Sequence, residues 1–193
     1  TEMHVTSAAG TDVVVNLSDA PCGGGWGYTT QAGSISHWPG GLCLAFPKAN
    51  TVNGVIVMDR GDMNLTFKRY VESPVTLTIE NDYVVDVVGE GTDAALFRSY
   101  SDAWGDPDAY ATSHIGWGMN PGARWDTLSL YDRSQTNGTE QRAFAGNFLY
   151  STGANEHAGR HTLGHFDLPM RNHTLTLDGD PVVIEGVLQG DLA

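Results

Sequence analysis

Two short segments rich in β-branched residues, 75–80 and 83–88, flank the pair Asn81-Asp82. Asn and Asp tolerate the backbone conformation that a tight two-residue hairpin turn requires. The pattern therefore predicts an antiparallel β-hairpin, and apolar or alternating segments at residues 11–17, 42–46 and 52–59 predict further strands. A run of short strands separated by turns restricts the chain to a fold dominated by antiparallel sheet.

The periodicity changes to a helical one after residue 91. Thr92 is expected to cap a helix whose apolar positions run from Ala94 to Trp104, and the helix is expected to stop at Gly105. The remaining expected elements are a short helix at 140–144, a strand at 147–151, a loop at 153–163, a strand at 165–169 and a closing hairpin of 174–177 and 182–188. We therefore expect an α+β fold, mainly antiparallel sheet with few helices, in a single domain spanning residues 1–193.

Charge and composition narrow the range of partners. The chain has 23 acidic and 10 basic residues, a formal net charge of -13, and no basic stripe to contact phosphates, so nucleic acid is not an expected partner. No apolar run is long enough to cross a bilayer and no leader pattern opens the chain, so we expect a cytoplasmic protein without a membrane partner. The glycines at 23–25 lack the Lys-Ser/Thr of a phosphate-binding loop, and we interpret them as a flexible loop.

The segment GHFDLP at residues 164–169 carries the strongest chemical signal. In a strand, His165 and Asp167 leave the same face, while Phe166 points the opposite way into apolar packing. Two histidines and one carboxylate with open positions are the usual holder of a non-haem Fe(II) that handles dioxygen. We expect His114 to supply the second imidazole.

Four of the seven histidines fall between His157 and His173, which raises the question of a helical metal site. His157, His161 and His165 have i, i+4 spacing, but the glycines at 159 and 164 disfavour that helix, each costing about 1 kcal/mol. The remaining histidines of this stretch are expected to face solvent or to support the ligands from behind: His157, His161 and His173.

Four segments together resemble the 2,5-dihydroxypyridine 5,6-dioxygenases, a family whose superfamily includes the M29 metalloaminopeptidases. The segments are HWPGG at 37–41, SHIGWGMNP at 113–121, RAFAGNFLYSTG at 142–153 and GHFDLPMRN at 164–172. The resemblance covers nearly the whole chain. It implies that the chain is the catalytic C-terminal domain of a two-domain enzyme roughly twice as long, with the N-terminal domain absent from this sequence.

The resemblance implies one Fe(2+) held by four residues, His114, Ser151, His165 and Asp167. Ser151 is promoted by the resemblance alone, because a neutral hydroxyl is a weak ligand beside imidazole and carboxylate. For His37, two roles stay open: a hydrogen bond within its loop, or an acid or base that moves a proton from a substrate hydroxyl.

Three further residues are expected to hold the substrate. Arg142 either neutralises a carboxylate or binds an anionic ring oxygen, and we assign it a substrate role. Trp38 and Trp117 are expected to hold the ring, although aromatic residues also serve in packing.

The resemblance implies a ring-opening dioxygenase that converts 2,5-dihydroxypyridine, or a related hydroxylated N-heteroaromatic, to an N-formylmaleamate-type product. A homo-oligomer is expected. The alternatives are an M29-like metalloaminopeptidase, which needs two metals and more carboxylates, and a non-catalytic metal-binding domain of the same fold.

Overall fold

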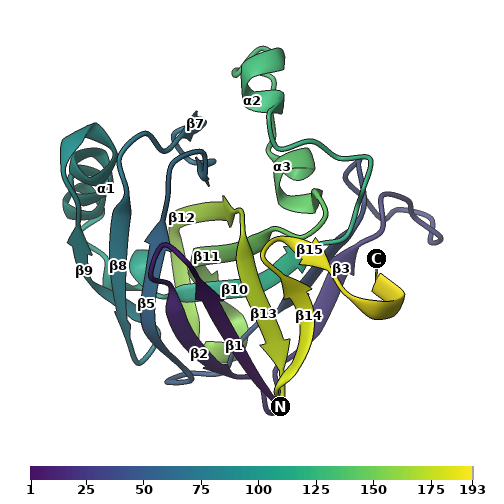
Figure 1. Cartoon of the computed structure of the whole chain (residues 1–193), viewed down its shortest axis with the longest axis horizontal. Helices are drawn as coiled ribbons and strands as arrows, with labels where there is room; N and C mark the ends of the chain where they lie inside the picture. The colour runs from purple at the N-terminus through teal and green to yellow at the C-terminus, as the bar shows by residue number, and fades with distance from the viewer. Residues whose placement is uncertain (193) are drawn as a thin grey trace.

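The computed structural model describes residues 1–192, and it places two antiparallel sheets face to face (Figure 1). The larger sheet has eight strands in the order β15-β14-β13-β1-β2-β5-β8-β9, and the smaller has five in the order β12-β11-β10-β4-β3. A further pair, β6 and β7, forms a short ladder of its own. Few helices accompany these sheets, so the α+β expectation is confirmed.

The strands of the larger sheet are β1 Glu2–Ser7, β2 Asp12–Asn16, β5 Val52–Met58, β8 Val75–Glu80, β9 Tyr83–Val88, β13 His173–Leu177, β14 Asp180–Ile184 and β15 Val187–Leu188. The smaller sheet contains β3 Cys22–Gly25, β4 Leu42–Ala45, β10 Thr112–Gly118, β11 Phe148–Asn155 and β12 Arg160–Met170. The two-stranded ladder pairs β6 Met63–Asn64 with β7 Arg69–Tyr70. The helices are α1 Gly91–Trp104, α2 Thr127–Leu130 and α3 Thr139–Ala143, with 3-10 turns at Pro107–Tyr110, Glu156–Ala158 and Gly190–Leu192.

The predicted hairpin at residues 75–88 is confirmed. Asn81 and Asp82 have φ values of 48° and 79°, the left-handed region that a two-residue turn of this kind requires. Every prediction of a strand at 11–17, 42–46, 52–59, 147–151 and 165–169 also corresponds to a strand, with ends shifted by a few residues. The first strand, β1, was not predicted.

The main hydrophobic core lies between the two sheets. Val5, Val13 and Leu77 of the larger sheet and Ile115 and Phe166 of the smaller one belong to the same buried cluster. Alternation along each strand sends the other residues to the outer faces. In the smaller sheet, that outer face carries the candidate site.

Helix α1 begins earlier than predicted. Its N-cap position is Glu90 rather than Thr92, and no side-chain cap bond forms there. The positive φ of Gly91, 81°, lets the chain turn from β9 into the helix before Thr92 is reached. The predicted stop is confirmed, because Gly105 adopts the left-handed conformation, φ 61°, that closes helices.

Two predicted loops are strands. The glycines at 23–25 form β3, because they pair with β4 through backbone bonds that need no side chain. Residues 153–163 do not form a loop over the site: β11 continues to Asn155 and β12 starts at Arg160, joined by a single 3-10 turn. The pairing of the two strands is irregular at this end, because Gly153 pairs with His165 and Asn155 pairs with Arg160, so the extra residues are on β12.

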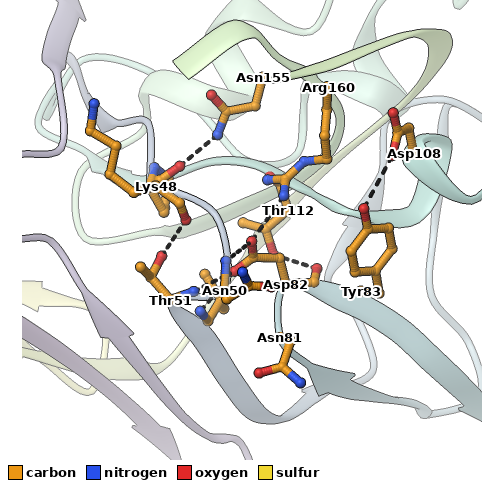
Figure 2. Close-up of polar contacts among 12 residues, drawn as sticks. Lys48, Asn50, Thr51, Asn81, Asp82, Tyr83, Asp108, Thr112, Asn155 and Arg160 are labelled. Atoms are coloured by element: carbon orange, nitrogen blue, oxygen red, sulfur yellow. Dashed lines mark hydrogen bonds and ion pairs between the residues drawn. The ribbon is translucent and has the colours of Figure 1, made fainter. Parts of the chain in front are cut away.

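A buried ion pair joins the two sheets (Figure 2). The carboxylate of Asp82, in the β8–β9 turn, accepts hydrogen bonds from the backbone N–H groups of Asn50, Thr51 and Val52 at 2.6, 2.8 and 2.9 Å. Nη1 of Arg160, at the start of β12, lies 2.9 Å from the same carboxylate. Asp82 is fully buried and Arg160 is 4% exposed, so this contact fixes the start of β12 against the larger sheet.

Within residues 1–192, no helix combines the length and apolar character needed to cross a membrane.

Candidate metal centre

Three metal-ligating side chains converge on the outer face of the smaller sheet. One ligand atom each from His114, His165 and Asp167 lies within 4.8 Å of the other two. Nε2 of His114 is 3.3 Å from Oδ1 of Asp167, and Nε2 of His165 is 3.3 Å from Oδ2. Two imidazoles and one carboxylate that meet in this way could hold a metal ion.

Strand pairing explains why residues so far apart in the sequence meet here. His114 of β10 is paired with Ser151 of β11, and Ser151 is paired with Asp167 of β12. These three residues therefore form a row across three adjacent strands. His165, two residues before Asp167, leaves the same face of β12.

The opposite face of β12 packs into the core, as predicted. Phe166 and Leu168 are fully buried in the cluster between the sheets, and the ring of Phe97 stacks on Phe166 with centroids 4.4 Å apart. A one-residue slip of β12 would exchange the two faces, so the burial of Phe166 and Leu168 also fixes the direction of His165 and Asp167.

The serine in the row bonds directly to the carboxylate. Oγ of Ser151 donates a hydrogen bond of 2.5 Å to Oδ1 of Asp167, and Ser151 has no exposed surface. Because the hydroxyl proton is engaged with Asp167, the lone pairs of Oγ remain free for another partner. Ser151 therefore lies where a fourth ligand could contribute.

A cation supports the carboxylate from α3. Nη1 of Arg142 donates to Oδ2 of Asp167 at 2.8 Å. Burial alone would raise the pKa of Asp167, but His114, His165 and Arg142 together outweigh it and hold that pKa well below its usual range. Asp167 is therefore a carboxylate at any physiological pH.

His165 is the member of the group that is most open to solvent. Its side chain is 43% exposed, against 8% for that of Asp167. Burial lowers the pKa of His165, but the hydrogen bond to Asp167, the charge of Asp167 and a bond to the backbone of Thr152 raise it more, and the net pKa is raised. The centre thus opens on the His165 side.

Of the predicted substrate residues, Trp117 is placed elsewhere. It is 8% exposed and belongs to the core cluster between the sheets. Trp117 lies three positions from His114 on β10, so the alternation of the strand sends its side chain to the opposite face. The position of Trp117 in the core therefore does not support its predicted substrate role.

The loop between β3 and β4 carries His37 and Trp38, both exposed. A Cβ on Gly40 would lie 2.2 Å from the backbone of Trp26, so the two ends of this loop approach each other more closely than any other residue type would allow. Asn120 holds the loop by donating to the carbonyl of Gly40 at 2.7 Å. His37 is outside the group of three converging ligands.

Trp38 lines a cavity of about 590 Å³ beside α3. The other residues on its wall are Pro39, Asn120, Gly122, Tyr131, Gln135, Thr136, Asn137, Glu140 and Gln141. None of the four predicted metal ligands is on this wall. Trp38 therefore has an exposed ring next to a cavity, which leaves its predicted substrate role open.

The other histidines do not join the group. His157 and His161 are exposed, as predicted, and the ring of His157 packs against Phe46 with centroids 5.8 Å apart. His173 neither faces solvent nor supports the ligands: it is 1% exposed and bonds to Thr11 and to the carbonyl of Arg171. That prediction was wrong because His173 begins β13, a strand of the other sheet.

Two neighbours of the centre were not anticipated. Phe46 packs its ring against His114, with centroids 5.7 Å apart, and Ser113 Oγ lies 3.2 Å from Nδ1 of the same histidine. Nothing in the local pattern indicates Phe46, because its position depends on the pairing of β4 with β10. Ser113 directly precedes His114, but its contact depends on a β-bulge that the sequence does not reveal.

Known proteins are similar to this chain in both sequence and structure. The sequence profile of the 2,5-dihydroxypyridine 5,6-dioxygenase family matches residues 1–190. The 2,5-dihydroxypyridine 5,6-dioxygenase of Pseudomonas putida is 39% identical over 186 residues, which cover 95% of this chain and 53% of that protein. The solved structure of 2,5-dihydroxypyridine dioxygenase from Pseudomonas putida KT2440 matches 99% of this chain and 56% of its own, with 38% identity and a TM-score of 0.93.

A more distant likeness concerns the fold alone. Wild-type AmpT from Thermus thermophilus matches 98% of this chain and 50% of its own at 18% identity, with a TM-score of 0.67. The chain therefore spans about half the length of the relatives it matches.

Proposed function

Because this chain belongs to the 2,5-dihydroxypyridine 5,6-dioxygenase family, we propose that it is the metal-binding part of an Fe(II)-dependent dioxygenase that opens a hydroxylated N-heteroaromatic ring. The observation that carries the proposal is the convergence of His114, His165 and Asp167 within 4.8 Å. The proposed substrate is 2,5-dihydroxypyridine or a close relative, and the proposed product is of the N-formylmaleamate type.

The donor set suits a single divalent iron. Two imidazole nitrogens and one carboxylate oxygen are the ligands found around non-haem Fe(II) in oxygenases, and Ser151 adds a neutral oxygen. Nε2 of His114 lies 3.3 Å from Oδ1 of Asp167. When the neutral ring of His114 carries its proton on Nδ1, Nε2 and this carboxylate oxygen present two lone pairs that one divalent cation could bind, which supports a metal at this point.

Bound iron would supply the chemistry that activates dioxygen and the substrate hydroxyl, and the chain's own residues would hold and orient the metal and the substrate. The reaction breaks one ring bond and places both oxygen atoms of dioxygen in the product, so the ring itself supplies the electrons and no other reductant is needed. Asp167 would contribute the negative charge, and Ser151 and Arg142, which both bond to it, would keep its oxygens oriented.

The proposed roles of Arg142, His37 and Trp38 depend on whether each side chain can contact the substrate. Arg142 is 23% exposed at its side chain, so the guanidinium can hold Asp167 and still present N–H groups to an anionic ring oxygen. His37 would handle the proton of the substrate hydroxyl, and Trp38 would pack on the ring. Both lie on the exposed β3–β4 loop, so they would need to be held against the centre by a further part of the enzyme.

That further part is proposed to be the half of the relatives that this chain does not span. The side chain of His165 is 43% exposed, so water can reach the centre. Oxygen chemistry on an electron-rich ring requires a site from which water is excluded. The missing half, or a neighbouring copy in a homo-oligomer, would cover it. The homo-oligomer and the cytoplasmic location stay predictions.

The test is oxygen uptake by the chain after anaerobic loading with Fe(II), against a panel of hydroxypyridines. We expect substrate-dependent uptake and a product that carries two labels when ¹⁸O₂ is used. Asp167→Asn is the matched negative control, because it removes the charge at nearly constant size. Absence of uptake on every ring, combined with release of amino acids from peptides, would replace the proposal with the aminopeptidase alternative.

A further inference from the structure

A β-bulge lies directly beside the proposed metal ligand His114. Thr112 is paired with Thr152, and His114 is paired with Ser151, so Ser113 is an extra residue on β10. A second irregularity lies in the pairing of β11 with β12, where Gly153 pairs with His165 and Asn155 pairs with Arg160, so the extra residues are on β12. In a regular strand Ser113 and His114 would point to opposite faces, but a bulge re-aims the extra side chain.

These two irregularities bring a hydroxyl between a backbone carbonyl and the imidazole. Oγ of Ser113 lies 2.6 Å from the carbonyl oxygen of Ala154 and 3.2 Å from Nδ1 of His114. Ser113 is only 3% exposed, so water does not compete freely for these bonds. A carbonyl has no proton to give, so the hydroxyl must donate its single proton to Ala154.

The direction of the hydrogen bond from Ser113 to Ala154 determines which ring nitrogen of His114 carries the proton. With its proton engaged, Oγ of Ser113 can only accept from Nδ1 of His114. The neutral ring then carries its proton on Nδ1, and the lone pair of Nε2 faces Oδ1 of Asp167 at 3.3 Å. Resting on the proposed metal centre, we propose that Ser113 is a positioning residue, which sets the tautomer and ring angle of His114 so that Nε2 binds the metal.

Ser113 would therefore affect metal binding without being a metal ligand itself. A partner that holds the second nitrogen of a ligating histidine raises metal affinity, and its loss typically costs about 10- to 100-fold. The partner here is a hydroxyl positioned by the bulge of β10 and by the irregular pairing of β11 with β12, rather than a carboxylate, so the site gains orientation without additional negative charge.

The decisive measurement uses Zn(II), which binds without redox chemistry. Histidine ring ¹⁵N NMR of the zinc-loaded chain should show His114 bound through Nε2 with a proton retained on Nδ1. Ser113→Ala should weaken zinc binding, measured by chelator competition, by about 10- to 100-fold. Ser113→Thr keeps the hydroxyl and should restore most of the affinity and the wild-type ring spectrum.

Thr66→Ala is the matched control. Its hydroxyl donates at 2.8 Å to the backbone carbonyl of His165, so this variant also loses a bond to a ligand-bearing strand but leaves both imidazoles untouched. Zinc affinity should then change far less than in Ser113→Ala. The control separates orientation of the ring from general loosening of the sheet.

Coordination through Nδ1 of His114, or an Nδ1 without a proton, would overturn the inference, and wild-type protein alone suffices for that measurement if Ser113→Ala does not fold. Zinc affinity in Ser113→Ala within threefold of wild type would overturn it as well. Failure of the dioxygenase proposal has a different signature: the zinc results would stand as expected, while no hydroxypyridine would support oxygen uptake.

Discussion

Replacing Arg160 by methionine should destabilise the whole domain, because it breaks the ion pair between the two sheets. The change leaves the carboxylate of Asp82 fully buried with three backbone N–H donors but no cation, and it removes the 2.6 Å bond from Nη2 of Arg160 to the carbonyl of Thr112. Loss of one partner of a buried pair costs about 3 to 5 kcal/mol. For a domain of this size, that corresponds to a fall in Tm of roughly 6 to 20 °C.

Urea unfolding followed by tryptophan fluorescence, with thermal unfolding by circular dichroism, measures this loss. The double variant Asp82→Asn/Arg160→Met tests its cause. If the cost comes from an uncompensated buried charge, removal of the charge should recover part of the stability, and the two single losses should exceed the double loss by about 1 to 3 kcal/mol. Asn also tolerates the φ of 79° at position 82.

Arg124→Met provides the matched control. Arg124 pairs with Asp126 at 2.6 Å, but its side chain is 61% exposed, so solvent screens the pair and the unfolding midpoint should not move measurably. Our account of the Asp82–Arg160 pair would be refuted if Arg160→Met lost less than about 1 kcal/mol, or if the double variant lost the sum of the two single losses.

The other predictions concern the centre and the pH response. His165→Ala and Asp167→Ala should each abolish iron binding, measured by elemental analysis, with far-UV circular dichroism unchanged; full iron occupancy in both would contradict the assignment. Ser151→Ala should retain more iron than Asp167→Ala because water can replace a neutral ligand, and equal loss would show that Ser151 is not the weakest ligand. Burial lowers the pKa of His173 to about 4, so the unfolded chain binds a proton that the native chain does not as the pH falls from about 6.5 to 4. Stability should therefore be fully present above pH 6.5 and should fall by about 3 kcal/mol towards pH 4, less so in His173→Asn, and identical pH profiles would exclude His173 as the cause. Addition of the part of the relatives that this chain does not span should raise the rate of oxygen consumption while leaving iron loading unchanged, whereas full activity from the 193-residue chain alone would show that its pocket is already closed.

Features that depend on neighbouring residues could be predicted from the sequence. The turn at Asn81-Asp82 follows from two residues that tolerate positive φ between β-forming segments, and the common face of His165 and Asp167 follows from the two-residue period of a strand. The end of α1 at Gly105 is local for the same reason. His114 was expected because the site needs a second imidazole, and Ser151 was reached only by resemblance to a family, since no local pattern relates either residue to Asp167.

Tertiary structure alone decided which distant residues meet. The register across β10, β11 and β12 aligns His114, Ser151 and Asp167, and α3 then brings Arg142 to the same carboxylate. Trp117 lies in the core between the sheets, because the alternation of side chains along β10 turns it to the face opposite His114. Register is a property of paired strands rather than of either strand, and a single bulge changes it. That is why the sequence pointed to the ligands on β12 while the bulge at Ser113, and the orientation it imposes on His114, became visible only in the folded chain.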